Sequence, residues 1–241
     1  MGHLRAYFTI ERILIICTAF LLYGITLKAD YSIDDSFVTK EGNITTQGLK
    51  AIPQIITTNY ASDDTGQSFD YRPVVKISFA IEHQFFGVSA RGSHFFNLFI
   101  YVICLLLMYR LLRLVMSDPK SRAPLYIVLL FTLLPIHTEV VASIKNRDIL
   151  LSFLFFLLAA LRLYGAELKQ RRIWLSYLLG GIFIYLGMLA KFDAVTSLAT
   201  IPALVFIKLK PIMRRKVVLV LALLAGIVMS RIMSRTITHQ S

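Results

Sequence analysis

Charged and hydrogen-bonding side chains interrupt two apolar runs between residues 135 and 148, where the sequence reads PIHTEVVASIKNRD. Polar groups at the depth of a membrane are costly, and they usually face a cavity. A carboxylate can take a proton from a hydroxyl, and Lys or Arg can bind a phosphate. The stretch therefore predicts a site for a phosphate-bearing substrate beside lipid. The polar residues that carry this prediction are His137, Glu139, Lys145, Arg147 and Asp148.

Two adjacent carboxylates, Asp34 and Asp35, follow the first apolar run by a few residues. A carboxylate just above a bilayer is partly desolvated, so its pKa can be tuned for proton transfer. Solvated loop charges are the alternative for this pair. For Arg72 the alternative to a substrate role is an interface anchor, and for His94 it is a packing residue. The further candidates at the same predicted level are Arg72 in DYRP, His94 and Asn97 in GSHFFN, and Lys191 and Asp193 in AKFD.

The elements that must position these residues are apolar helices. Hydrophobic residues make up 56% of the 241 residues, which is too apolar for a water-soluble domain. The composition therefore predicts a single all-α integral membrane domain over residues 1–241, with about seven transmembrane helices. Runs near the length of about 20 residues that crosses a bilayer fall at about 10–27, 93–115, 124–144, 149–165, 173–190, 194–209 and 216–233.

The charge distribution orients these spans. Fifteen of the 26 Lys and Arg residues and three of the 14 Asp and Glu residues fall on one side of the seven-span arrangement, so that side holds the whole net charge of +12. The other side has eleven basic and eleven acidic residues. Because short loops rich in Lys and Arg stay in the cytoplasm, the neutral side is predicted to be extracytoplasmic. Anionic lipid headgroups account for the basic excess, so membrane lipids and no nucleic acid are the expected partners.

The largest extracytoplasmic segment is a loop at about residues 28–92. Two stretches in it, at about 47–58 and 73–86, have apolar residues at helical spacing and predict amphipathic helices that lie on the membrane. Pro73 is placed to start the second helix, and Gly87 is placed to stop it. A carboxylate from the start of this loop can reach the polar stretch between the third and fourth spans only if the loop folds back over them.

These motifs, in their order along the chain, resemble the polytopic glycosyltransferases of the GT-C superfamily. They are the Asp-Asp pair, YRP, HxxN, PIHTE, RD and AK, and they extend over roughly residues 30 to 200. Within the superfamily the chain is most similar to bacterial relatives of the tetratricopeptide-linked O-mannosyltransferases. The resemblance implies a GT-C-like core with its catalytic carboxylate in the first extracytoplasmic loop. By that resemblance Asp34 is the candidate base and Asp35 its neighbour, PIHTE carries over to Pro135 through Glu139, and the basic site carries over to Arg147 and Lys191.

The implied reaction is an inverting sugar transfer from a polyprenyl-phosphate-sugar donor. The carboxylate takes the proton of an acceptor hydroxyl as that oxygen attacks the anomeric carbon, and polyprenyl phosphate leaves. Arg72, Arg147 and Lys191 would stabilise the negative charge that develops on the phosphate. The resemblance favours mannose as the sugar and a protein or glycan as the acceptor. His137 and Glu139 are too few ligands for a metal assignment, so the cofactor is left unassigned.

The resemblance also implies a location, the bacterial inner membrane with the site facing the periplasm, or alternatively the endoplasmic reticulum membrane with a lumenal site. Two departures from it stand out. Many relatives have Lys-Glu where this chain has Lys191 and Phe192, and Asp193 follows one position later. Relatives also continue into further spans and a tetratricopeptide region, so we expect the chain to be either a fragment or a minimal form.

Two rival classes of protein remain at this point, a transporter or flippase of lipid-linked or anionic solutes and a non-catalytic membrane subunit. Transporters tend to have charged or broken helices near the membrane midplane. The predicted spans have apolar centres, and the charges gather at their ends. This pattern favours the enzyme over the transporter, while a non-catalytic subunit stays open.

Overall fold

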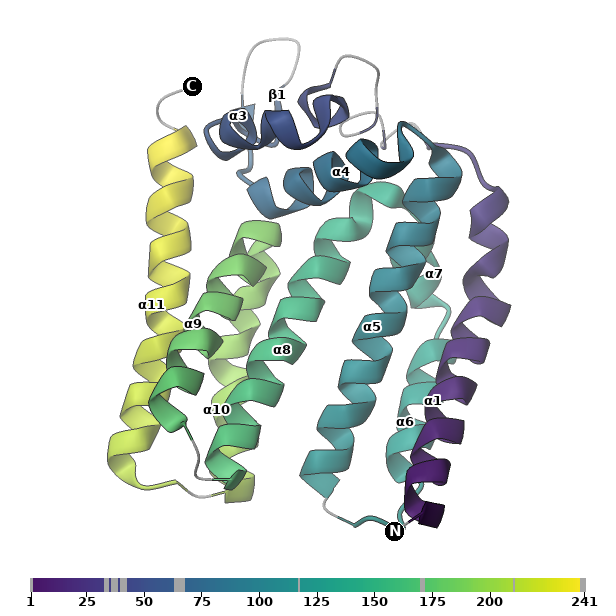
Figure 1. Ribbon diagram of the computed structural model, residues 1–241. Helices are drawn as coiled ribbons and strands as arrows, with labels where there is room; N and C mark the ends of the chain where they lie inside the picture. Colours follow the sequence, from purple (N-terminus) through teal and green to yellow (C-terminus); the bar gives the residue numbers. More distant parts are fainter. Residues whose placement is uncertain are drawn as a thin grey trace.

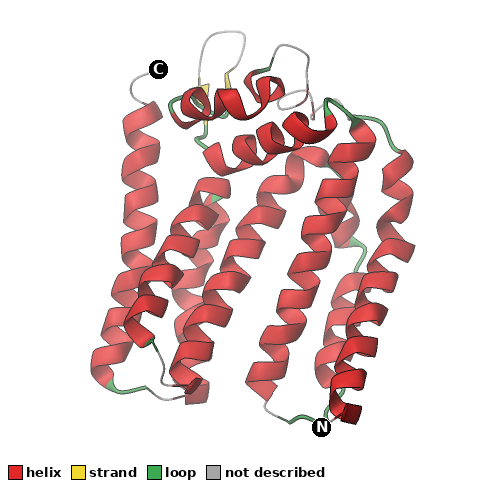
Figure 2. Cartoon of the chain, viewed as in Figure 1, coloured by secondary structure: helices red, strands yellow, loops and turns green. Residues whose placement is uncertain are grey.

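Long helices lie side by side in the computed structural model, and shorter ones cross one end of them (Figures 1 and 2). The structure describes residues 2–32, 35, 39, 43–62, 68–116, 118–169, 172–209 and 211–238, and the backbone alone for 2–9, 61–62, 68–69 and 238. The bundle is made of α1 (Gly2–Tyr23), α5 (Ala90–Met116), α6 (Ala123–Leu133), α7 (Ile136–Ala142), α8 (Arg147–Lys169), α9 (Ile173–Ala190), α10 (Ser197–Leu209) and α11 (Met213–Thr238).

The apolar helices match the predicted membrane architecture. Among the described residues, six helical stretches are long and apolar enough to cross a membrane, and the bent pair α6 and α7 makes seven if it counts as one span. The strands β1 (Ala61–Ser62) and β2 (Ser68–Phe69) form only a short antiparallel pair in the first loop. The chain is thus an all-α integral membrane protein with about seven transmembrane helices, as predicted.

The third predicted span, over 124–144, is divided into two helices at Leu134 and Pro135. Helices α6 and α7 meet at a bend of 73°. Leu134 has an extended backbone with a ψ of 123°, because the ring of Pro135 disfavours a helical conformation in the residue before it. The short 3-10 helix η4 (Ile144–Asn146) then leads into α8. The polar stretch consequently lies in α7, η4 and the first turn of α8.

The first loop covers this end of the bundle, which we name the loop end (Figure 1). The two predicted surface helices are confirmed, and α4 has the predicted bounds. The first is a 3-10 helix continued by a short α-helix, because Gly48, with a φ of 69°, lies outside the right-handed helical region. Gly87, with a φ of 65°, ends α4. The elements of the loop are η1 (Gly24–Lys28), η3 (Ile44–Ala51), α3 (Ile52–Ile56) and α4 (Pro73–Phe86).

Helix α4 packs one face onto the bundle. Val75, Phe79 and Glu82 recur at positions i, i+4 and i+7, which fall on the same side of a helix, and all three are fully buried. Phe85 and Phe86, which the apolar pattern groups with this face, are 71% and 57% exposed. The buried face of α4 therefore brings a carboxylate into the protein interior.

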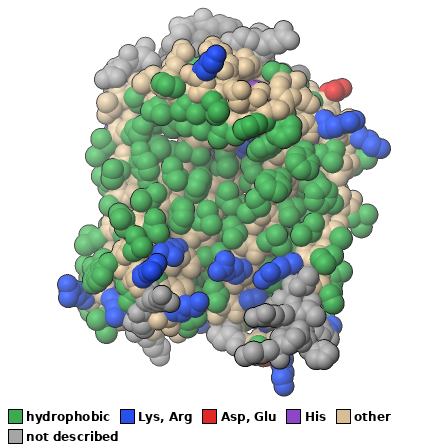
Figure 3. Space-filling view, in the orientation of Figure 1, with side chains coloured by type: hydrophobic (Ala, Val, Ile, Leu, Met, Phe, Trp, Pro, Cys, Tyr) green, Lys and Arg blue, Asp and Glu red, His purple; other side chains and the backbone are tan. Residues whose placement is uncertain are grey.

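The opposite end of the bundle, which we name the basic end, holds the start of α1 and the connections α5–α6, α8–α9 and α10–α11 (Figure 1). Figure 3 shows apolar side chains across the middle of the face in view, with Lys and Arg side chains gathered beneath them at the basic end. The clustering of basic residues at one end of the spans, expected from the sequence, is therefore seen in the structure.

Candidate functional site

An ion-paired group of four residues lies at the loop end, and we name it the Asp148 cluster: Asp70, Arg72, Asp148 and Lys191. Arg72 donates from Nη1 to Asp148 Oδ2 and from Nη2 to Asp70 Oδ2. The Lys191 Nζ lies 3.4 Å from the same Asp148 oxygen. The Asp148 side chain is 4% exposed, whereas those of Arg72 and Lys191 are 24% and 23% exposed. One buried carboxylate thus pairs with two cations whose side chains remain partly exposed.

Separate parts of the chain bring the Asp148 cluster together. Arg72 directly precedes α4, and Asp70 has a positive φ of 52°, a conformation that Asp adopts more readily than most residues. Asp148 lies in the first turn of α8, where the positive end of the helix dipole favours a carboxylate. The backbone N–H of Ile149 donates to Asp148 Oδ1 over 2.6 Å. Lys191 follows the end of α9 with an extended backbone, φ −158° and ψ 139°.

A second group, the Arg147 cluster, is buried beneath α4 and consists of Arg147, Glu82, Ser93 and Asn97. The Arg147 Nη2 lies 2.6 Å from Glu82 Oε2, and the Arg147 Nε donates to Asn97 Oδ1 over 2.8 Å. Ser93 accepts a bond from Arg147 through its carbonyl, over 3.2 Å, and donates one to Glu82 through Oγ. The guanidinium also lies 3.8 Å from the centre of the Phe79 ring. Because Arg147 and Glu82 have no exposed surface, this cluster joins α4, α5 and α8 inside the protein.

The first loop returns to the start of α8 through Asp35. The Asp35 side chain is buried, and its two oxygens accept hydrogen bonds from the backbone N–H groups of Ser32 and Lys145, over 2.8 Å and 2.9 Å. Lys145 lies in η4, between the third and fourth spans. The loop therefore folds back over this connection, as the predicted site requires. Asp34, the predicted base, lies outside the described residues.

Tyr60 connects the Asp148 cluster to the loop. The Arg72 guanidinium lies 5.1 Å from the centre of the Tyr60 ring, and the Tyr60 N–H donates to the carbonyl of Asp70 over 2.8 Å. Burial raises the pKa of the Tyr60 hydroxyl to about 12, and the negative charge of Asp148 adds to this effect. The hydroxyl is therefore neutral near pH 7 and can donate a hydrogen bond.

Two cavities adjoin the Asp148 cluster, and Lys191 and Asp193 line both of them. The smaller, of about 120 Å³, is also lined by Arg72 and Arg231. The larger, of about 240 Å³, has a wall of apolar side chains from α8 and hydroxyls from η5 (Phe192–Thr196) and α10. An apolar wall next to cations suits an amphiphile with an anionic group. The residues that give the larger cavity this character are Ile149, Phe153, Phe156, Thr196 and Thr200.

Three of the predicted residues, His94, His137 and Glu139, lie apart from the site: among the described residues they form no side-chain hydrogen bond or ion pair with either cluster. His94 is 2% exposed, and neither ring nitrogen has a hydrogen-bond partner. His137 packs against Phe131, with ring centres 4.1 Å apart, and Glu139 is exposed. None of the three lines the cavities at Lys191. Within the same residues, no group of three or more His, Cys, Asp or Glu side chains is placed to hold a metal ion.

Comparison with known protein families identifies the chain. A family model described as dolichyl-phosphate-mannose-protein mannosyltransferase matches residues 70–236, a range that contains both clusters and both cavities. The chain belongs to this mannosyltransferase family. The match begins at Asp70, so the Asp34 and Asp35 pair precedes it.

The individual proteins that match this mannosyltransferase-family chain include protein O-mannosyl-transferases, which is the group that the sequence motifs resemble. The protein O-mannosyl-transferase Tmtc1 of Drosophila melanogaster is 28% identical over 75% of this chain and 21% of its own length. The TMTC2 proteins of Mus musculus and Homo sapiens are 31% and 30% identical over 74% of this chain and 22% of their own lengths. The chain thus spans about a fifth of the length of these curated relatives, which are animal proteins. No solved structure matches the chain.

Sequence reasoning missed the partner of the buried arginine in this mannosyltransferase-family chain. Glu82 shares the helical spacing of Val75 and Phe79, and that spacing is a signal of burial. A buried carboxylate requires a cation or hydrogen-bond donors, so Glu82 was detectable as one half of an ion pair. Tyr60 and Asp70 lie in irregular segments, where periodicity carries no such signal.

Proposed function

We propose that this member of the mannosyltransferase family transfers a sugar, with mannose as the first candidate, from a polyprenyl-phosphate-linked donor to a hydroxyl of a protein acceptor at the extracytoplasmic face. The observation that supports this most directly is the Asp148 cluster, in which Arg72 and Lys191 lie partly exposed beside cavities at the end of an apolar bundle. A lipid-linked phosphate carries its charge at this level. The descriptions of the family and its relatives support the sugar and the acceptor.

The donor would lie along the larger cavity, with its chain against Phe153 and Phe156 and its phosphate at Lys191. A Lys ammonium has three N–H donors, so one can stay directed at Asp148 while others bind the phosphate. Arg72, which is tied to the same carboxylate, would supply the second cation. Asp148 keeps both cations in place without donor, and this preorganisation reduces the cost of binding.

The reaction is a direct displacement at the anomeric carbon. Asp34 is the proposed base: it takes the acceptor proton while the acceptor oxygen bonds to the anomeric carbon. The bond from that carbon to the phosphate oxygen breaks, the phosphate leaves with the electron pair, and the configuration inverts. Fixed cations next to the departing phosphate stabilise the charge that develops on it. Asp35 would hold the loop beside η4 through its bonds with Ser32 and Lys145.

Arg147 was predicted to contact the phosphate, and its complete burial favours a different role. Through Glu82 and Asn97 it anchors the first turn of α8 beneath α4, and the next residue is Asp148. We therefore assign Arg147 as a positioning residue for the Asp148 cluster.

The test is transfer of labelled mannose from dolichyl-phosphate mannose to an acceptor peptide by the full chain in proteoliposomes. Asp34→Asn keeps the size of the side chain and removes the base, so transfer should fall about 100- to 10,000-fold. Asp63→Asn, a change of a carboxylate in the polar YASDDTG segment of the same loop, is the matched control and should leave transfer unchanged.

If Asp35→Asn abolishes transfer while Asp34→Asn does not, the base is misassigned within the pair. If neither change affects transfer, or if the wild-type chain moves the donor across the membrane without cleaving it, the glycosyltransferase proposal is wrong and a transporter is favoured. A chain that binds the donor and neither cleaves nor moves it would be a non-catalytic subunit.

A further inference from the structure

A cavity of about 490 Å³ opens at the basic end, at the opposite end of the bundle from the Asp148 cluster. Helices α5, α8 and α9 all contribute to its lining. Four basic side chains surround it: Arg110, Arg162, Lys169 and Arg172. Leucine side chains form the apolar part of its wall, and they are Leu107, Leu114, Leu158 and Leu161.

Among the residues that the structure describes, the positive charge around this cavity has no acidic counterion. No acidic side chain lines it, and within the described residues none of the four basic side chains forms an ion pair. The Nε of Arg162 is buried without a hydrogen-bond partner. Glu167, the acidic residue of this part of α8, is itself buried and bonded to Tyr177. Four cations around one cavity repel each other, and a bound anion would relieve that repulsion.

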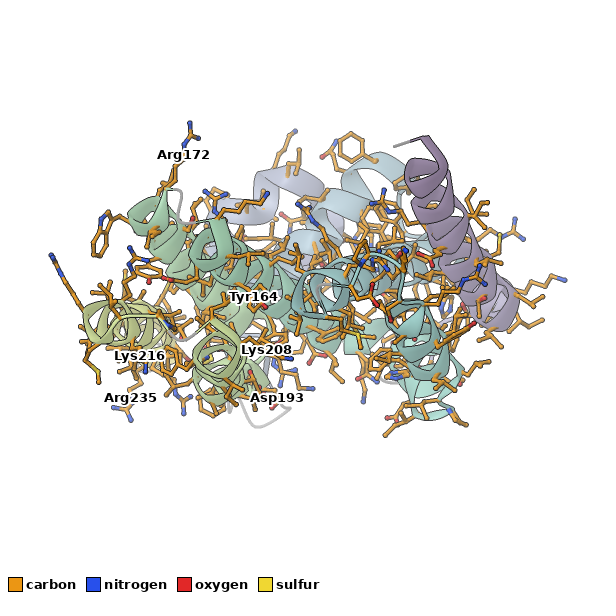
Figure 4. All side chains as sticks on the ribbon, turned by 90° about the horizontal axis from the view of Figure 1, so that it is seen from below. Tyr164, Arg172, Asp193, Lys208, Lys216 and Arg235 are labelled. Atoms are coloured by element: carbon orange, nitrogen blue, oxygen red, sulfur yellow. The ribbon has the colours of Figure 1, made fainter. Side chains whose placement is uncertain are left out.

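The backbone around Arg172, the residue before α9, adds to the positive electrostatic potential in the cavity. Arg172 has a left-handed conformation, φ 51° and ψ 40°, which is uncommon for a residue other than glycine. Its carbonyl accepts hydrogen bonds from the N–H and the Oγ of Ser176, each over 3.0 Å, so the backbone is fixed. Figure 4 shows the Arg172 side chain extending away from the helices. The positive end of the α9 dipole lies at the same cavity.

We propose that this cavity binds an anionic phospholipid, with its phosphate among the four basic side chains and an acyl chain along the leucine wall. A single amphiphile satisfies both halves of the cavity, whereas a free phosphate would satisfy only the basic rim. The distribution of Lys and Arg along the sequence assigns the basic end to the cytoplasm, and the cytoplasmic leaflet is the one rich in anionic lipid. This site is independent of the proposed sugar transfer.

The charge arm of the test compares lipid binding to purified variants of the full chain in mild detergent. Bound lipid is counted by native mass spectrometry during titration with phosphatidylglycerol, phosphatidylcholine or inorganic phosphate. We expect retention of phosphatidylglycerol by the wild type and about 30-fold weaker binding by the double variant Arg162→Gln with Arg172→Gln, since each basic group near an anionic lipid contributes about fivefold. Lys120→Gln with Lys208→Gln removes the same charge outside the cavity and should bind normally.

The steric arm fills the cavity while keeping all four cations. A Cβ added at Gly165, which lines the cavity, meets no atom within 4 Å. Gly165→Leu should therefore fold normally, and the new leucine side chain should fill the space proposed for the acyl chain. We expect it to lose phosphatidylglycerol while its melting temperature without lipid stays close to that of the wild type.

Two results would overturn the proposal. If the control pair weakens binding as much as the cavity pair, the attraction comes from diffuse surface charge. If inorganic phosphate competes as well as the lipid does and Gly165→Leu binds normally, the site takes a free anion and the lipid assignment is wrong.

Discussion

The buried pair of Arg147 and Glu82 allows a quantitative prediction. Removing one partner of a buried ion pair leaves an uncompensated charge, which costs about 3–5 kcal/mol. Neither side chain has exposed surface, so solvent does not screen the charge that remains. Arg147→Ala also removes the bond to Asn97 and the contact with the Phe79 ring. We therefore expect a loss of stability in the upper half of that range.

The measurement is thermal unfolding of the purified chain in detergent. A change of 1 kcal/mol shifts the melting temperature of a chain of this size by about 2–4 °C, so a loss of about 4–5 kcal/mol in Arg147→Ala should lower it by about 8–20 °C. Arg91→Ala, at an exposed Arg of α5, is the matched control and should shift it by less than about 2 °C. Equal melting temperatures for the two variants would refute the buried ion pair.

A double variant separates the structural role of Arg147 from contact with a substrate. Arg147→Met combined with Glu82→Leu replaces the pair with apolar residues, which is often neutral or stabilising. The double variant should therefore melt higher than either single variant. Sugar transfer retained in it supports the positioning role. Restored stability without transfer would show instead that Arg147 contacts the phosphate.

Three further predictions concern the donor site, pH and topology. Lys191→Met should slow sugar transfer about 10- to 150-fold, because it removes a charged hydrogen bond to the phosphate; a normal rate would remove Lys191 from the site. Burial lowers the pKa of Lys76 from 10.5 to about 8, so the unfolded chain binds more protons than the folded chain between these values. The free energy of unfolding should therefore rise with pH in this window, by up to about 1.4 kcal/mol per pH unit. The melting temperature of the wild type should rise with pH relative to that of Lys76→Met, and an equal pH dependence of the two melting temperatures would contradict the pKa shift. Cysteines introduced at Ser62 and Ser121 should be labelled from opposite sides of the membrane, with Ser62 outside, and labelling from one side would overturn the span arrangement.

The sequence determined where the helices lie because the signals for them are local. A stretch of about 20 apolar residues is long enough to cross a bilayer whatever its neighbours are, so hydropathy predicted the membrane segments. Pro73 and Gly87 fixed the bounds of α4 through their own backbone preferences. Pro135 disfavours a helical conformation in the residue before it, so the sequence also predicts a disturbed helix in the third span. The angle of the bend there depends on how α7 packs against neighbouring helices, and the hydropathy pattern gives no information about that packing.

The sequence also selected residue types that the structure brings to one end of the bundle, but it left their partners open. Asp35 and Lys145 are 110 positions apart, and Arg72 and Asp148 are 76 apart. A charge is stabilised by whichever group the packed helices place beside it, so these pairs exist only in the tertiary structure.

Arg147 and Asp148 show most clearly what the tertiary structure alone decided. The sequence predicts that both belong to one phosphate site. Successive residues of a helix point about 100° apart, so the two side chains face different neighbours. Arg147 is buried beneath α4 against Glu82, and Asp148 reaches the partly exposed Arg72 and Lys191. The physical difference between an internal ion pair and a candidate phosphate site is therefore set by which helices surround the first turn of α8.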